Sequence, residues 1–214
     1  MNTLVDLSKK INPVNIEEVF IIGSGVSLCD YDINSLKNKI CVFINSSVVL
    51  KSVINPGVSF FVSTDSLILR WDYSSILHKC DYLILRENEN FYKKFKDNAY
   101  YFSCGDDYDS LLNLFQSKNI IGCSSIISAT HIFLQLGSKY INIIGFDLSK
   151  DEKGFIYFWQ KCYKDIRPYF LDNKYIISTD VKNTGRNWDV QRKFMSDILL
   201  NSKLRINING KFNK

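Results

Sequence analysis

The feature that most constrains the fold is a series of short apolar runs, rich in β-branched and aromatic residues, that alternate with helical or turn-rich segments. Such continuous runs predict strands covered on both faces, and their alternation with helices predicts βαβ units in a mainly parallel sheet. The expected strands are 19–22, 40–44, 59–62, 81–85, 100–103, 140–144, 174–177 and 204–208. The expected helical segments are roughly 47–54, 66–78, 89–97, 107–117, 125–136, 155–170 and 188–200.

This pattern predicts the α/β class, with a Rossmann-like doubly wound, mainly parallel sheet. The chain has 214 residues, which fits a single domain, 1–214. A chain of this length can bury a core large enough to be stable without disulfides or bound metals. The polar and aromatic stretch 149–170 is a candidate lid or insertion. The end of the chain, 207–214, is expected to be a frayed basic tail.

Charge and segment composition narrow the classes of partner. The formal charge of +5 suits an anionic ligand or a loose association with anionic lipid, and the Lys and Arg residues lack the dense clustering typical of nucleic-acid binding. The first residues lack the basic start and apolar run of a signal peptide, and no apolar stretch approaches the length of a membrane span. We therefore expect a cytoplasmic protein that could associate peripherally with the inner face of the inner membrane.

Six cysteines and two histidines bear on metal binding and on the redox compartment. The cysteines form no Cys-x-x-Cys pair, and two histidines give little support to a zinc site. Several cysteines lie inside apolar runs, where a thiol behaves as a small buried hydrophobe. Reduced thiols in a cytoplasmic compartment are the expectation. His131 lies in an apolar helix and is predicted to be a core residue, and His78 is predicted to end a helix.

Small and polar residues follow four of the expected strands, at the end where ligands bind in open α/β sheets. Gly23, Ser24 and Gly25 form a turn whose N–H groups could cradle a phosphate, although the same residues would make a tight βα connection. The turn departs from the dinucleotide fingerprint, because Leu28 stands where the third glycine belongs. Asn45, followed by Ser46, could read a base or a sugar, or form a local Asx turn.

Two further positions carry a similar choice between a ligand contact and a helix cap. Asp65, after Thr64, could hold a ribose hydroxyl, a metal or a sugar, and could equally cap the following helix. Ser124 and Ser125 precede an apolar helix, whose first amides suit a carboxylate or a phosphate.

Taken together, these blocks resemble a superfamily of bacterial surface-glycan proteins. It includes the Campylobacter-type sialyltransferases and the lipopolysaccharide core transferase that adds the third Kdo. Motility accessory factors and archaeal hydroxymethylpterin pyrophosphokinases share a similar pattern. The likeness covers roughly residues 18–160. It rests on the order and spacing of Val19–Leu28, Val42–Asn45, Phe61–Asp65, Cys123–Ser125, Leu136–Lys139 and Ile143–Asp147.

The resemblance implies a single domain similar to GT-A glycosyltransferases, which binds a CMP-sugar donor. The implied donor-binding residues are Gly23, Ser24, Gly25, Asn45, Ser46, Thr64, Ser124, Ser125 and Tyr157. Position 24 departs from the sialyltransferase pattern, which has asparagine there. The histidine base of those enzymes aligns with Thr184, and no histidine follows His131. The candidate bases are therefore Asp65, Asp147 and Asp180.

The leading hypothesis is a glycosyltransferase that moves a ulosonic acid, of the Kdo or sialic-acid type, from a CMP-sugar to a lipopolysaccharide or other surface glycan. The implied acceptor is lipid-linked. A metal is expected to be dispensable, because a CMP donor carries one phosphate. One alternative is pyrophosphoryl transfer from ATP to a hydroxymethylpterin, with Asp65 and Asp147 as magnesium ligands. A non-catalytic glycan-assembly domain is the other.

Overall fold

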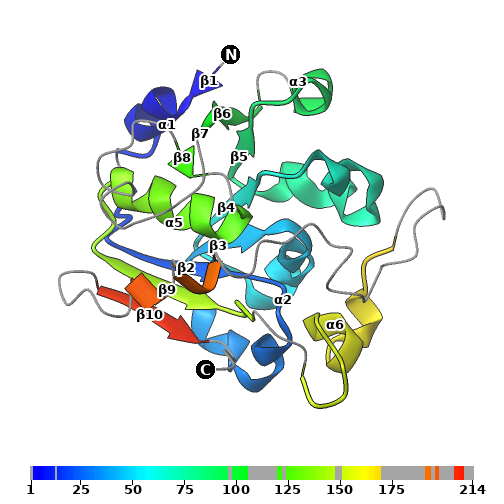
Figure 1. The fold of residues 1–214 in the computed structure, drawn as a ribbon. Helices are drawn as coiled ribbons and strands as arrows, with labels where there is room; N and C mark the ends of the chain where they lie inside the picture. The colour runs from blue at the N-terminus through cyan, green and yellow to red at the C-terminus, as the bar shows by residue number, and fades with distance from the viewer. Residues whose placement is uncertain are drawn as a thin grey trace.

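The structure is a computed structural model that describes residues 2–12, 14–95, 98–105, 120–121, 124–147, 151–169, 191–193, 196–197 and 205–209. Eight parallel strands form one sheet in the order β1-β6-β5-β4-β3-β2-β9-β10 (Figure 1). The expected α/β class and parallel sheet are confirmed. The strands are β1 (Asn2–Thr3), β2 (Glu18–Ile22), β3 (Ile40–Ile44), β4 (Val58–Ser63), β5 (Tyr82–Arg86), β6 (Tyr100–Phe102), β9 (Tyr140–Ile144) and β10 (Arg205–Asn209). A separate parallel pair joins β7 (Cys104–Gly105) to β8 (Ile120–Ile121).

Helices and 3₁₀ turns connect these strands. The α-helices are α1 (Leu4–Lys10), α2 (Lys51–Ile54), α3 (Glu89–Phe95), α5 (Ser125–Gln135) and α6 (Phe158–Lys161). The 3₁₀ segments are η1 (Val26–Asp30), η2 (Ile33–Leu36), η3 (Asn45–Leu50), η4 (Ser66–Arg70), η5 (Asp72–Lys79) and η6 (Lys164–Ile166). Two of the expected helices, 47–54 and 66–78, are therefore largely 3₁₀ structure.

Two buried clusters cover the two faces of the sheet, as the continuous apolar strands predict. Val19 and Ile21 of β2 pack in the cluster that contains α5, whereas Ile22 packs in the cluster that contains η1 to η5 and α6. Successive side chains of a strand point to opposite faces, so each strand supplies both clusters. His131 is buried in α5, and His78 lies in the last turn of η5, as expected.

The ends of the chain differ from expectation. The expected strand 204–208 is present as β10, and Asn207 to Asn209, which were also assigned to a frayed tail, are paired with β9 in this strand. Main-chain hydrogen bonds to β9 hold these residues, so the tail does not fray from residue 207. Residues 210–214 and the expected strand 174–177 lie outside the described residues. Near the N-terminus, β1 and α1 were not expected; Thr3 and Asp6 cap α1 reciprocally.

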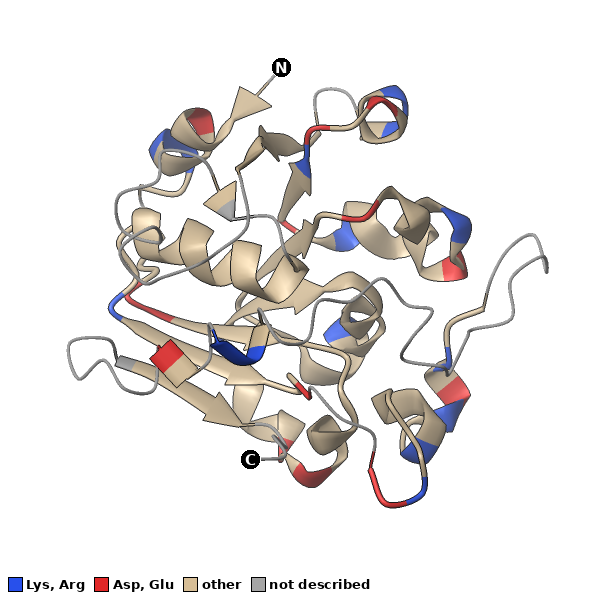
Figure 2. Ribbon diagram, viewed as in Figure 1, with Lys and Arg blue, Asp and Glu red and all other residues tan. Residues whose placement is uncertain are grey.

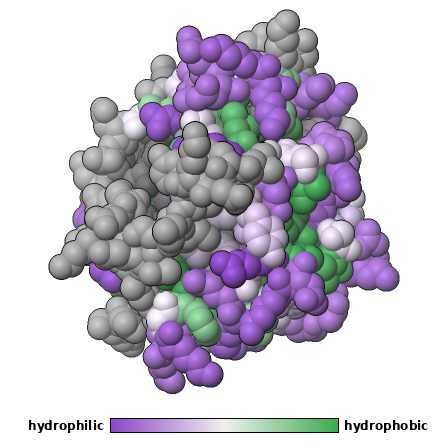
Figure 3. All heavy atoms as spheres, turned by 90° about the vertical axis from the view of Figure 1, so that its right-hand side faces the viewer, coloured by the Kyte–Doolittle hydropathy of each residue, from purple (hydrophilic) through white to green (hydrophobic). Residues whose placement is uncertain are grey.

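The surface is mixed in charge and in hydropathy. Basic and acidic residues alternate over the ribbon (Figure 2), and the described ion pairs, such as Lys39–Glu18 at 3.3 Å, are exposed. On the face seen in Figure 3, hydrophobic residues form separate patches between hydrophilic ones. No described helix combines the length and the apolar character that a membrane crossing requires.

Two buried thiols predict a loss of stability in alkali. Burial raises the pKa of Cys41 and of Cys80 to about 12, from an ordinary value of 9.0. The folded state therefore keeps protons that the unfolded state releases above pH 9.0. Folding stability should fall as pH rises from there toward 12, by about 1.4 kcal/mol per pH unit for each thiol.

Urea titrations from about pH 8 to about pH 11 would measure this slope. The variant Cys41→Ala/Cys80→Ala, compared with the natural chain, isolates the thiols from the tyrosines and lysines that also titrate. An equal slope in the two proteins would contradict the assignment.

Candidate functional site

The carboxyl ends of four neighbouring strands bring most of the predicted site residues to one edge of the sheet. The strands β4, β3, β2 and β9 are adjacent and parallel. The segments that follow them therefore leave the sheet at the same edge, where ligands bind in open α/β folds. These segments begin at Thr64, Asn45, Gly23 and Gly145.

A row of hydrogen bonds links the polar residues along this edge. The Ser24 and Ser46 hydroxyl oxygens lie 2.9 Å apart. Asn45 has a left-handed backbone, with φ of 51°, and its side-chain oxygen accepts a hydrogen bond from the Ser63 hydroxyl at 2.8 Å. The Asn45 side chain thus reaches across to β4. Ser63 was not among the predicted site residues, because its role depends on strand pairing.

The row continues to the start of α5. The Thr64 amide donates to the Ser125 hydroxyl at 3.0 Å, and the Thr64 and Ser125 hydroxyl oxygens lie 2.9 Å apart. Ser124 caps α5, since its hydroxyl accepts from the Ile127 amide at 3.3 Å. The capping role predicted for Ser124 is confirmed. The amides of the first helical turn lack intrahelical partners, so the positive end of α5 lies at this edge.

The two glycines of the turn have a packing role. Gly25 donates its amide hydrogen to the Gly145 carbonyl at 2.8 Å. A Cβ at Gly25 would lie 2.5 Å from an Asp147 carboxylate oxygen, and one at Gly23 would fall against the Gly145 carbonyl. The turn is therefore a tight connection against the end of β9, and the Gly25 amide is already engaged. Binding of a ligand by Gly23 or Gly25 stays a prediction.

The candidate catalytic aspartates occupy different places. Asp147 is half-buried, and its carboxylate accepts from the Ser27 amide at 2.6 Å, at the start of η1. Asp65 is exposed and caps η4 by accepting from the Leu67 amide at 2.8 Å. The capping role predicted for Asp65 is confirmed, and its exposed carboxylate still faces solvent. Asp180 lies outside the described residues.

Tyr157 lies on the glycine turn, in a cluster of aromatic rings. It forms an antiparallel bridge with Gly25, and its ring stacks on Trp159 with a centroid distance of 4.3 Å. Trp159 meets Trp71 edge-on, and Trp71 stacks on Tyr73. The sequence analysis missed Trp71 and Tyr73, which lie about 85 residues before Tyr157 and meet it only in the folded chain.

Tyr73 lies near both Asp65 and Tyr157. Burial raises the pKa of Tyr73 well above its ordinary value, and the negative charges of Asp65 and then Tyr157 and Asp72 raise it further. The Tyr73 hydroxyl therefore stays protonated at neutral pH beside the Asp65 carboxylate. The protonated Tyr73 hydroxyl is therefore an uncharged group close enough to Asp65 and Tyr157 to feel their charges.

A disulfide bond joins the two segments that flank the turn. Cys29 of η1 and Cys162 after α6 are bonded, with Cα atoms 5.9 Å apart. The expectation of reduced thiols is therefore wrong for this pair. Their separation of 133 residues hides the pairing, since only the return of the chain to the glycine turn brings them together. Residues 151–169, the described part of the candidate lid 149–170, include Cys162 and so are joined to η1 by this bond. Opening of this segment as a lid stays a prediction.

Two further features bear on ligands. Within the described ranges, no group of three or more His, Cys, Asp or Glu side chains is placed to hold a metal ion. Metal independence remains a prediction. A hollow of about 450 Å³ lies beside β9 and β10, and its lining includes Tyr31, Asn142 and Asn207. It is separate from the row of polar residues at the strand ends.

The chain was compared with family models, curated proteins and solved structures. No family model and no curated protein matches the chain. Among solved structures, the chain is similar to the sialyltransferase CstII from Campylobacter jejuni in complex with a substrate analogue, cytidine-5'-monophosphate. The two share 19% identity with a TM-score of 0.39, over 64% of this chain and 71% of that chain.

Proposed function

We propose that this chain is a glycosyltransferase that takes a ulosonic acid, of the Kdo or sialic-acid type, from a CMP-sugar. One observation carries the proposal: polar residues from separate segments form a single hydrogen-bonded row at the ligand-binding edge of a parallel sheet. The row consists of Ser24 with Ser46, Asn45 with Ser63, and Thr64 with Ser125. All of these residues except Ser46 lie in the motifs that resemble the surface-glycan superfamily, and Ser46 directly follows one of them. The proposed acceptor is a lipid-linked surface glycan, reached by peripheral association with the inner membrane face.

The chemistry requires stabilisation of a departing phosphate. The start of α5 is the proposed phosphate site, because its first-turn amides and the Ser124 and Ser125 hydroxyls gather positive potential there. Asn45 offers both donor and acceptor groups for the cytosine or ribose. Tyr157, on the glycine turn, is the proposed residue that closes over the donor.

Asp65 is the proposed general base for the acceptor hydroxyl. Its carboxylate is exposed and belongs to the segment that also carries Thr64, next to the start of α5. Asp147 already accepts from the Ser27 amide, which favours an orienting role for that residue. A base close to the leaving phosphate can remove the acceptor proton as the new bond forms.

Calorimetry with CMP, UMP, AMP and GDP tests the nucleotide assignment, and CMP should bind most tightly. Asn45→Ala should weaken CMP binding by about tenfold or more, because a donor–acceptor pair is lost. Asn55→Ala is the matched control: Asn55 has the same left-handed backbone, with φ of 50°, but precedes β4 at the opposite edge. Preference for a purine or a diphosphate would reject the proposal.

A turnover assay separates catalysis from binding. CMP release from a CMP-sugar should continue in the presence of a chelator, and Asp65→Asn should abolish most of it while CMP binding persists. If the chain binds CMP but releases none from any CMP-sugar, the non-catalytic alternative is the better account. Magnesium-dependent formation of AMP from ATP would favour pyrophosphoryl transfer.

A further inference from the structure

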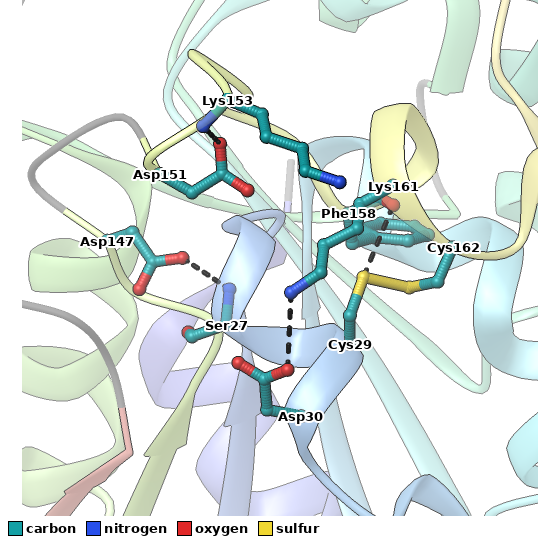
Figure 4. Close-up of polar contacts among 9 residues, drawn as sticks. All are labelled: Ser27, Cys29, Asp30, Asp147, Asp151, Lys153, Phe158, Lys161 and Cys162. Carbon is teal, nitrogen blue, oxygen red and sulfur yellow. Dashed lines mark hydrogen bonds and ion pairs between the residues drawn. A yellow bond between two sulfur atoms is a disulfide. The ribbon is translucent and has the colours of Figure 1, made fainter.

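The segment that carries Tyr157 is attached to the glycine turn by one covalent bond and a few weaker contacts. The Phe158 amide donates to the Ser24 carbonyl at 3.1 Å, and Tyr157 bridges Gly25. On the outer side of the segment, the disulfide joins Cys29 to Cys162 (Figure 4). Both ends of α6 are therefore tied to the turn that begins the proposed donor site.

The non-covalent contacts are modest. Lys161 and Asp30 form an ion pair at 3.3 Å, with side chains that are 37% and 51% exposed, and exposed pairs contribute little. α6 has only four residues, too few to be stable by itself. Phe158 and Trp159 are buried and anchor the middle of the segment. The disulfide is thus the covalent constraint that adds to this burial and limits how far the Tyr157 side of α6 can move from the turn.

The disulfide is also the accessible sulfur pair. Cys29 and Cys162 are half-buried, whereas Cys41 and Cys80 are buried in the core. Thiol–disulfide exchange requires that a thiolate reach one of the two sulfur atoms. A reductant can therefore attack this pair at the surface.

We propose that the Cys29–Cys162 disulfide is a redox-controlled latch that holds the Tyr157 segment closed over the glycine turn. A dithiol reductant supplies two electrons and two protons: its thiolate attacks one sulfur and releases the other cysteine, and its second thiol then displaces the first cysteine from the mixed disulfide. The products are the Cys29 and Cys162 thiols and an oxidised reductant. The opening of the Tyr157 segment on reduction does not depend on the proposed function. The effect on ligand affinity rests on the proposed CMP site.

The experiment compares the full chain before and after treatment with dithiothreitol. Thiol titration should show a gain of two thiols per chain. Hydrogen exchange at the Phe158 amide should become at least about tenfold faster, because the segment opens more often. CMP affinity should fall in proportion to the fraction of closed molecules, by about twofold if reduction leaves half of the chains open, since the closed state is the competent one.

Two variants control the comparison. Cys29→Ser/Cys162→Ser should show the fast exchange from the start and should not respond to dithiothreitol. Cys104→Ser, which removes a half-buried free thiol, should respond like the natural chain. No gain of thiols, or equal Phe158 exchange in both redox forms, would overturn the latch. If exchange changes but neither form binds CMP, the latch is supported and the proposed function fails. Equal CMP affinity in the two redox forms would refute only the claim that the latch controls the site.

Discussion

Replacing Gly23 with alanine should lower the free energy of unfolding by about 3 kcal/mol or more. A Cβ at this position would fall against the Gly145 carbonyl oxygen and lie 2.7 Å from Cδ1 of Ile126. The carbonyl cannot move aside easily, because it accepts the Gly25 amide at 2.8 Å. The ends of β2 and β9 would have to separate, and the loss of their close packing is the cost.

Urea denaturation of Gly23→Ala measures this cost, with Gly154→Ala as the control. Gly154 has φ of +79°, but no atom lies within 4 Å of the Cβ that alanine would add. Its substitution therefore brings only backbone strain, of about 1 kcal/mol. Should the two variants be equally stable, close packing would not explain Gly23. A direct contact with a ligand would then become the better explanation.

Phe60→Ala should have a comparable or larger effect, a loss of about 3–5 kcal/mol. Phe60 is fully buried at the centre of β4. Its ring stacks on Tyr82 of β5 with centroids 4.8 Å apart, and Phe133 of α5 meets it edge-on at 5.1 Å. Alanine would leave a cavity at the point where β4 and α5 pack together.

Phe60→Leu distinguishes the cavity from the aromatic contacts. Leucine keeps most of the apolar volume, so the variant should lose only about 1 kcal/mol from the ring interactions. Denaturation of both variants gives the comparison. Equal losses in the two would mean that ring geometry, rather than volume, dominates this part of the core.

The strands of the central sheet were the most predictable part of the molecule. The ranges Ile40–Ile44 and Tyr140–Ile144 agree at both ends with β3 and β9. Ile40–Ile44 is a continuous apolar run, Tyr140–Ile144 is apolar apart from Asn142, and each is closed by a small or polar residue. Burial on two faces favours that composition. The two-residue strand β1 has no such signature, because its place depends on its pairing with β6.

The candidate site was only partly predictable. Residues that follow strands could be expected at one edge, because parallel strands end together. The partners Ser63, Trp71 and Tyr73 could not, since they depend on strand order and on how η5 packs against α6. Gly23 and Gly25 were recognised as special positions, yet their crowding against Gly145 and Asp147 needed coordinates.

The order of apolar runs and polar strand ends was enough to determine the fold class and the edge where a ligand would bind. Burial of a strand is encoded in its own residues, and the residues that follow it mark its carboxyl end. Tertiary structure alone decided the pairing of Cys29 with Cys162 and the place of Tyr157 on the glycine turn. It also decided that the strand expected at 204–208 pairs with β9 at the edge of the sheet. Each of these depends on contact between segments distant in sequence, and local composition carries no record of which distant segment will be the neighbour.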